Sequence, residues 1–103
     1  MKDFKKLFVK SDEFIQKAIE IIDNYESKFV IVVSEKYELI GTVTDGDVRR
    51  GLLNGYKLKD PLKLVMNKKP ISIDEHEPIK AALELMNKYS LHQLPVINKN
   101  KRV

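Results

Sequence analysis

The chain has 103 residues, and its 19 Lys and Arg against 15 Asp and Glu give a formal net charge of +4 at pH 7. This length accommodates one ordinary domain or two very small ones. Because there is no cysteine, disulfides, thiolate zinc sites and cysteine nucleophiles are excluded, and only two histidines remain for a metal site. No apolar run approaches the roughly 18 residues of a membrane span, and the start lacks the apolar stretch of a secretory signal. We therefore expect a soluble, cytoplasmic protein with no membrane partner.

The first predicted elements are a strand, a helix and a second strand. Residues 7–9 form a short apolar run, and Ser11 is a plausible N-cap for the helix that follows. Four apolar residues at helical spacing predict its buried stripe: Ile15, Ala18, Ile19 and Ile22. Residues 29–33 are continuously apolar, which is typical of a strand covered on both faces.

The next stretch predicts a strand that runs directly into a helix. Residues 39–44 favour the strand, and residues 45–54 favour the helix. Its inward residues should be Val48, Leu52 and Leu53, and Gly55 should form its left-handed C-cap. A basic connector, residues 56–69, follows, with Pro61 and Pro70 at its breaks.

An internal repeat organises the chain, because residues 7–39 align without a gap on residues 71–103. The identical pairs are Glu13/Glu77, Ile15/Ile79, Ala18/Ala82, Glu20/Glu84, Tyr25/Tyr89 and Val32/Val96. The second copy predicts strands at 71–73 and 94–97, and a helix capped by Asp74. Its buried stripe should comprise Ile79, Ala82, Leu83 and Met86. We divide the chain into a first repeat (1–60), a linker (61–70) and an incomplete second repeat (71–103), and expect a fragment of a longer protein.

The corner between the strand at 39–44 and its helix is the strongest candidate for chemistry. Free N–H groups and the helix dipole suit an anion there. Thr44 supplies a hydroxyl, and Asp47 supplies a carboxylate one turn later, the type of group that holds the vicinal hydroxyls of ribose. The guanidinium of Arg49 or Arg50 could donate paired hydrogen bonds to a phosphate.

The same spacing also fits a capping box, in which Thr44 and Asp47 satisfy only the helix's own N–H groups. One residue can serve both roles, since a hydroxyl donates and accepts. No glycine-rich phosphate-loop motif occurs. The spacing therefore leaves a cap and a ligand site open.

Three segments resemble the CBS domain: Gly41-Thr42-Val43-Thr44-Asp45-Gly46-Asp47, Val65-Met66 and Leu94-Pro95-Val96-Ile97. The doubled pattern is similar to a tandem CBS pair, or Bateman module. This implies an α/β fold of two β-α-β-β-α repeats, the second truncated, packed through their sheets with helices outside. Residues 44–51 further resemble the CBS pairs attached to sugar-phosphate nucleotidyltransferases.

The resemblance implies a regulatory module that binds an adenosine nucleotide (AMP, ADP or ATP) or S-adenosylmethionine and controls an attached or partner enzyme. It requires no cofactor, catalyses nothing itself and forms a homodimer. The family's Ser/Thr-x-x-Asp motif falls on Thr44 and Asp47. The lining of adenine falls on Phe29, Val30 and Ile31, with Val9 or Lys10. In the second repeat only Leu94 and Pro95 remain as lining.

Two other classes of function remain as alternatives. One is a ligand-free dimerisation or scaffold module in which Thr44 and Asp47 form only a cap. The other is nucleic-acid binding by the basic connector, which we rank last because Tyr56 is the lone aromatic residue among its lysines.

Overall fold

In the computed structural model, which describes residues 4–25, 27–89 and 94–103, both repeats form the predicted order of elements. The first repeat comprises η1 (Phe4–Leu7), β1 (Phe8–Val9), α1 (Ile15–Asn24), β2 (Phe29–Val33), β3 (Leu39–Thr44) and α2 (Asp45–Leu53). A short helix, η2 (Leu62–Leu64), lies in the connector, and the second repeat comprises β4 (Ile73–Asp74), α3 (Ile79–Lys88) and β5 (Val96–Ile97). Leu7 belongs to η1 and not to the first strand. Strands β1, β4 and β5 have two residues each, fewer than predicted.

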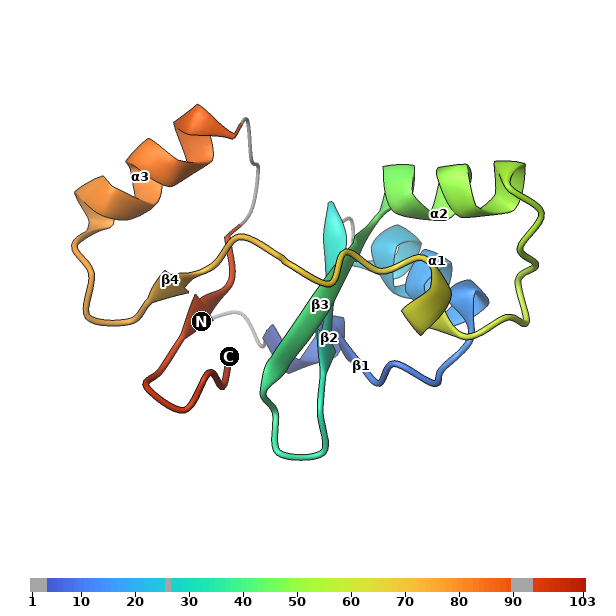
Figure 1. Cartoon of the computed structure of the whole chain (residues 1–103), viewed down its shortest axis with the longest axis horizontal. Helices are drawn as coiled ribbons and strands as arrows, with labels where there is room; N and C mark the ends of the chain where they lie inside the picture. The colour runs from blue at the N-terminus through green and yellow to red at the C-terminus, as the bar shows by residue number, and fades with distance from the viewer. Residues whose placement is uncertain (1–3, 26, 90–93) are drawn as a thin grey trace.

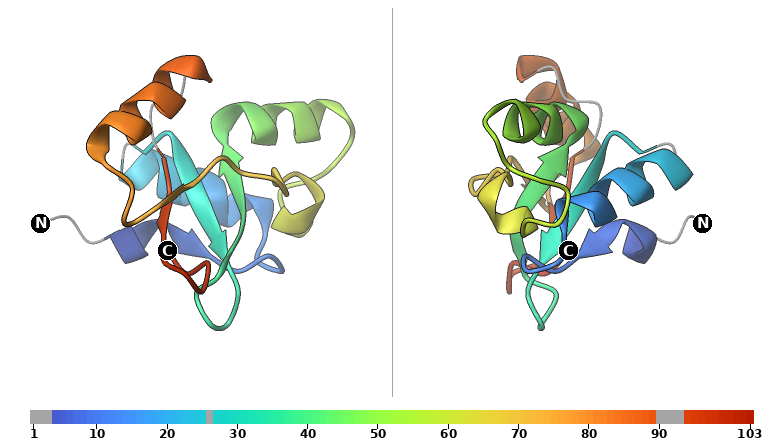
Figure 2. Two further views of the ribbon diagram at one scale, coloured as in Figure 1. Left: turned by 60° about the vertical axis from the view of Figure 1, so that its left-hand side comes forward. Right: turned by 90° about the vertical axis from the view of Figure 1, so that its right-hand side faces the viewer.

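The first repeat is built on a three-stranded sheet in the order β1-β2-β3. Strand β1 is parallel to β2, and β3 is antiparallel to β2. A separate parallel pair, β4 and β5, belongs to the second repeat. Helices α1 and α2 cover one side of the first sheet, and the second repeat lies on its other side (Figures 1 and 2). Within the described ranges, none of the helices is both long and apolar enough to cross a membrane.

The outer edge of β3 is covered by two distant segments. Thr42 exchanges backbone hydrogen bonds with Asn67 of the connector, at 3.2 and 2.8 Å, and the N–H of Leu39 donates to the Lys101 carbonyl at 2.8 Å. Gly41 permits this approach, since a Cβ there would lie 2.9 Å from the Asn67 carbonyl oxygen. These hydrogen bonds at Thr42 and Leu39 therefore cover a strand edge that could otherwise pair with another chain.

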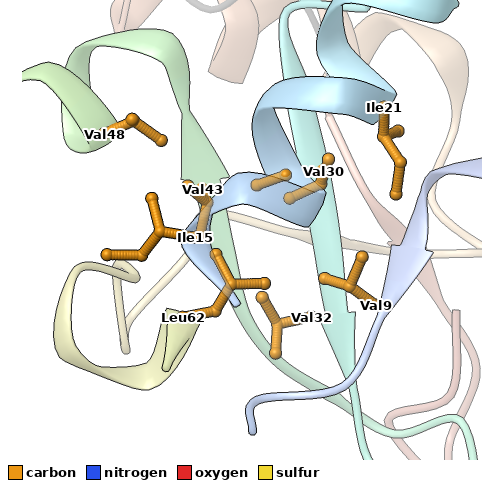
Figure 3. Packing of buried hydrophobic residues seen from close by; sticks show 9 residues of the cluster. Val9, Ile15, Ile21, Val30, Val32, Val43, Val48 and Leu62 are labelled. Atoms are coloured by element: carbon orange, nitrogen blue, oxygen red, sulfur yellow. The ribbon is translucent and has the colours of Figure 1, made fainter. Parts of the chain in front are cut away.

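The main core lies between the first sheet and its helices (Figure 3). Its buried members are Val9, Ile15, Ala18, Ile21, Val30, Val32, Val43, Val48 and Leu62. On the opposite face of β2, Phe29, Ile31 and Val33 pack with neighbours that include Val103 from the second repeat. All five residues of β2 are buried, which confirms the prediction of a strand covered on both faces.

The inward faces of the first two helices differ from the predicted stripes. In α1, Ile21 is buried, whereas Ile19 and Ile22 are only partly buried and pack against the core. In α2, the prediction for Leu52 and Leu53 was wrong, because they are 40% and 80% exposed. Val48 and Gly51 face inward, and Gly51 lies so close to the connector that a Cβ there would overlap Val65. The predicted left-handed conformation of Gly55 is confirmed by its φ of 99°.

Neither Ser11 nor Asp74 caps the helix that was predicted to follow it. The residue before α1 is Phe14, without a side-chain hydrogen bond, because connector carbonyls take the first N–H groups of α1. The N–H of Ile15 donates to the Asp60 carbonyl at 2.9 Å, and that of Gln16 donates to Leu58 at 3.0 Å. Pro78 precedes α3, and Asp74 accepts from the His76 N–H in the turn before it. Ser11 and Asp74 therefore do not act as the predicted N-caps.

The predicted buried stripe of α3 was also wrong, because no residue of α3 is buried and Ile79 and Leu83 are 78% and 59% exposed. Ile15, the counterpart of Ile79 in the first repeat, is fully buried in a cluster with residues of β3, α2 and η2. Among the described residues, no counterparts of these three elements follow β5. The same sequence pattern therefore gives a buried face in one repeat and an open face in the other.

Candidate functional site

The candidate site is the corner at which β3 ends and α2 begins. Thr44 is the N-cap of α2, and its hydroxyl oxygen accepts from the Asp47 N–H at 3.1 Å. The Asp47 carboxylate returns the bond, since its Oδ2 accepts from the Thr44 N–H at 2.9 Å. This reciprocal pair is a capping box, so the cap that the spacing predicts is confirmed.

Two arginines complete the corner, and each pairs with a different carboxylate. Arg50 donates to Asp47 Oδ1 at 2.8 Å, whereas Arg49 donates to Asp45 Oδ2 at 2.9 Å. The Asp47 side chain is only 18% exposed, and that of Arg50 is 68% exposed. The backbone of Thr44 therefore holds the Asp47 carboxylate in place, whereas the side chain of Arg50 beside it is largely exposed to solvent.

The capping box leaves binding capacity for a ligand. Because the Thr44 oxygen acts as an acceptor, its hydroxyl proton remains available for donation. A carboxylate offers about four acceptor positions, and the structure shows one bond to each oxygen of Asp47. The first N–H groups of a helix also lack partners within the helix. The corner could therefore hold both a sugar hydroxyl and an anion without losing its cap.

Of the predicted adenine-lining residues, Phe29 lies nearest to this corner. It faces Thr44 in the register of β2 and β3 and is 8% exposed. Ile31 shares its face of the sheet, whereas Val30 belongs to the main core on the opposite face. Within residues 29–31, the side chains of Phe29 and Ile31 therefore lie on the face away from the main core, where they are buried at 8% and 4% exposed.

Ser27 also belongs to this end of the sheet, and sequence reasoning missed it. Its hydroxyl donates to the Phe29 carbonyl at 2.6 Å and accepts from the Phe29 N–H at 3.2 Å. A serine two residues before the apolar run at 29–33 was the available signal in the sequence. The backbone groups of Phe29 are therefore already engaged by a neighbouring side chain.

Val9 and Lys10 lie at the other end of the sheet. Val9 faces Val32, at the end of β2 that is remote from Phe29 and Thr44. Both residues line a separate hollow of about 230 Å³, together with Phe8, Glu13, Val33 and Tyr37. The Lys10 ammonium donates to the Ser34 carbonyl at 2.9 Å and lies 5.0 Å from the Tyr37 ring centre. The structure thus separates these two residues from the other candidates.

In the second repeat, Pro95 is buried, and its carbonyl accepts from the Ile73 N–H at 3.0 Å, which joins β4 to the β5 segment. Leu94 is half-buried beside it. The described side chains include no group of three or more His, Cys, Asp or Glu that could hold a metal ion.

A family model described as the CBS domain matches residues 2–54 and again residues 59–103. The chain belongs to the CBS domain family. The two matches and the mixed α/β architecture confirm the predicted tandem CBS pair. A CBS pair is a regulatory module and not a catalytic one.

Two curated relatives of this CBS pair are several times longer than the chain. An uncharacterised protein of Chlamydia muridarum is 38% identical over 87 residues, which cover 82% of this chain and 26% of the relative. The arabinose 5-phosphate isomerase KdsD of Francisella tularensis is 35% identical over 97 residues, 92% of this chain and 29% of the isomerase. The chain spans 19% to 35% of the length of such relatives.

Solved structures share the fold of this CBS pair. The pair of protein MJ0100, in complex with 5′-methylthioadenosine and S-adenosylmethionine, superposes with a TM-score of 0.80 at 25% identity, over 93% of this chain and 75% of that one. The CBS protein PAE2072 of Pyrobaculum aerophilum, complexed with AMP, has a TM-score of 0.81 at 17% identity, over 93% of this chain and 74% of that one.

Proposed function

We propose that this CBS pair binds an adenosine nucleotide at the corner of Thr44 and Asp47 and thereby regulates an attached or partner enzyme. The observation that carries the proposal is the half-buried Asp47 carboxylate, fixed by the Thr44 N–H and still able to accept further hydrogen bonds. Complexes of similar CBS pairs with AMP and with S-adenosylmethionine support the ligand class.

In this proposal the Asp47 carboxylate accepts from the ribose hydroxyls, and the Thr44 hydroxyl donates to ribose or phosphate. Adenine lies against Phe29 and Ile31, on the side of the sheet that faces the second repeat. A ligand there would favour one arrangement of the two repeats over another. Regulation then follows from its different affinity for the two arrangements.

The regulated enzyme in this proposal acts on a sugar phosphate in the cytoplasm. The support is the likeness to the arabinose 5-phosphate isomerase, together with the resemblance of residues 44–51 to the pairs on sugar-phosphate nucleotidyltransferases. The active form is a homodimer, and the catalytic residues belong to the enzyme and not to this chain.

Calorimetric titration of the folded protein with AMP, ADP, ATP and S-adenosylmethionine tests the proposal. We expect saturable binding of at least one adenosine nucleotide, and a rise in melting temperature with that ligand because it binds only the native state. If none of the four binds while the protein remains folded, the proposal fails.

A second candidate function is a ligand-free dimerisation scaffold. The complete capping box favours it, since both side chains already serve α2. In that case the same titration gives no heat and no ligand shifts the melting temperature, whereas size-exclusion chromatography with light scattering still shows a dimer.

A further inference from the structure

The guanidinium of Arg50 contacts the carboxylate that the proposed function assigns to ribose. It bonds to Asp47 Oδ1 at 2.8 Å, and its Nη1 lies 3.2 Å from the position of a Cβ on Gly46. The space left by the missing side chain of Gly46 is therefore bordered by Arg50. A ligand that approaches Asp47 across Gly46 meets this guanidinium first.

The Arg50 guanidinium is held at this place by its ion pair with Asp47. Arg50 lies in the last turn of α2, yet its guanidinium reaches back to the first turn, where the positive end of the helix dipole repels it. The Asp47 carboxylate offsets this repulsion through its ion pair with Arg50. An ion pair with one member exposed to this degree contributes little, so a suitable anion can draw the guanidinium away.

Building on the proposed function, we propose that Arg50 pairs with Asp47 in the ligand-free protein and makes the site selective for phosphate-bearing adenosine ligands. A nucleotide displaces the guanidinium from Asp47 and offers it a phosphate in exchange. Adenosine also has to displace it, but offers no anion in return. Arg50 is thus a specificity-determining residue, and the corner favours AMP over adenosine.

The local charges support this exchange. Asp45 and Asp47 place two carboxylates in the first turn of α2, which would repel a phosphate. Arg49 remains paired with Asp45 at 2.9 Å. Arg50 is therefore the cation at this corner whose release also uncovers the ribose-binding carboxylate.

The test compares R50Q with R49Q, which removes the same charge one residue away from a pair that does not involve Asp47. Kd values for AMP and adenosine are measured at one ionic strength, since surface charges are screened by salt. In the wild type we expect AMP to bind at least about tenfold more tightly than adenosine. R50Q should weaken AMP by about tenfold or more and leave adenosine unchanged or up to about fivefold tighter.

R49Q should leave the preference of AMP over adenosine within about threefold of the wild type, as expected for an exposed charge. The inference is overturned if R50Q weakens both ligands equally, if R49Q abolishes the preference as R50Q does, or if the wild type binds adenosine as tightly as AMP. A folded wild type that binds none of AMP, ADP, ATP and S-adenosylmethionine refutes the proposed function itself, and the wild-type titrations alone reveal that outcome.

Discussion

Replacement of Leu62 by alanine should lower the free energy of unfolding by about 2–5 kcal/mol. Leu62 belongs to the connector, yet its side chain is completely buried in the main core near Ile15 and Val43. Its N–H also donates to the Glu13 carbonyl at 2.8 Å. Truncation leaves a cavity that the surrounding strands cannot fill, because β2 is packed on both faces.

Urea unfolding followed by circular dichroism measures this loss, and Leu64→Ala is the matched control. Leu64 lies in the same short helix η2 but is 45% exposed, so its truncation should cost less than about 1 kcal/mol. Equal losses for the two variants would contradict the view that the connector is part of the core of the first repeat.

Replacement of Asp47 by asparagine should weaken AMP binding by roughly tenfold to a hundredfold, the range expected when hydrogen bonds to a charged acceptor are lost. Asparagine retains an oxygen that can accept from the Thr44 N–H. The cap of α2 should therefore survive, and the melting temperature without ligand should change little. Calorimetric Kd values for AMP, with melting curves, provide the measurement.

Asp45→Asn is the control for this experiment. Asp45 carries the same charge in the same helical turn, but its side chain is 69% exposed and pairs with Arg49. We expect its Kd for AMP to stay within about threefold of the wild type, since it contributes only a screened surface charge. Equal weakening by both variants would assign the effect to net charge and remove the specific role of Asp47.

Local patterns in the sequence predicted the order of elements in the first repeat. The continuous apolar run of β2 is strong, and the spacing of Thr44 and Asp47 fixes a capping box that depends on only four residues. Gly55 ends α2 for the equally local reason that glycine adopts positive φ without strain.

Features that depend on distant segments escaped sequence reasoning. The start of α1 is satisfied by the carbonyls of Leu58 and Asp60, which periodicity cannot reveal. Likewise, Ile15 and Ile79 occupy equivalent helical positions, but only Ile15 has neighbours from a second strand and helix to bury it.

The candidate site shows the same division between local and distant features. Its corner follows from the order of β3 and α2, whereas Val9 and Lys10 could be placed only once the register of β1 against β2 was known. The pairing of Arg50, and not Arg49, with Asp47 is a matter of side-chain geometry. Sequence offered both arginines as equal candidates.

The most direct test of the account is a crystal structure of the protein with AMP. We expect ribose hydroxyls about 2.5–3.0 Å from the Asp47 carboxylate, with Arg50 moved from Asp47 toward the phosphate. AMP bound elsewhere, such as in the hollow beside Lys10 and Tyr37, with the ion pair of Arg50 and Asp47 intact, would contradict it.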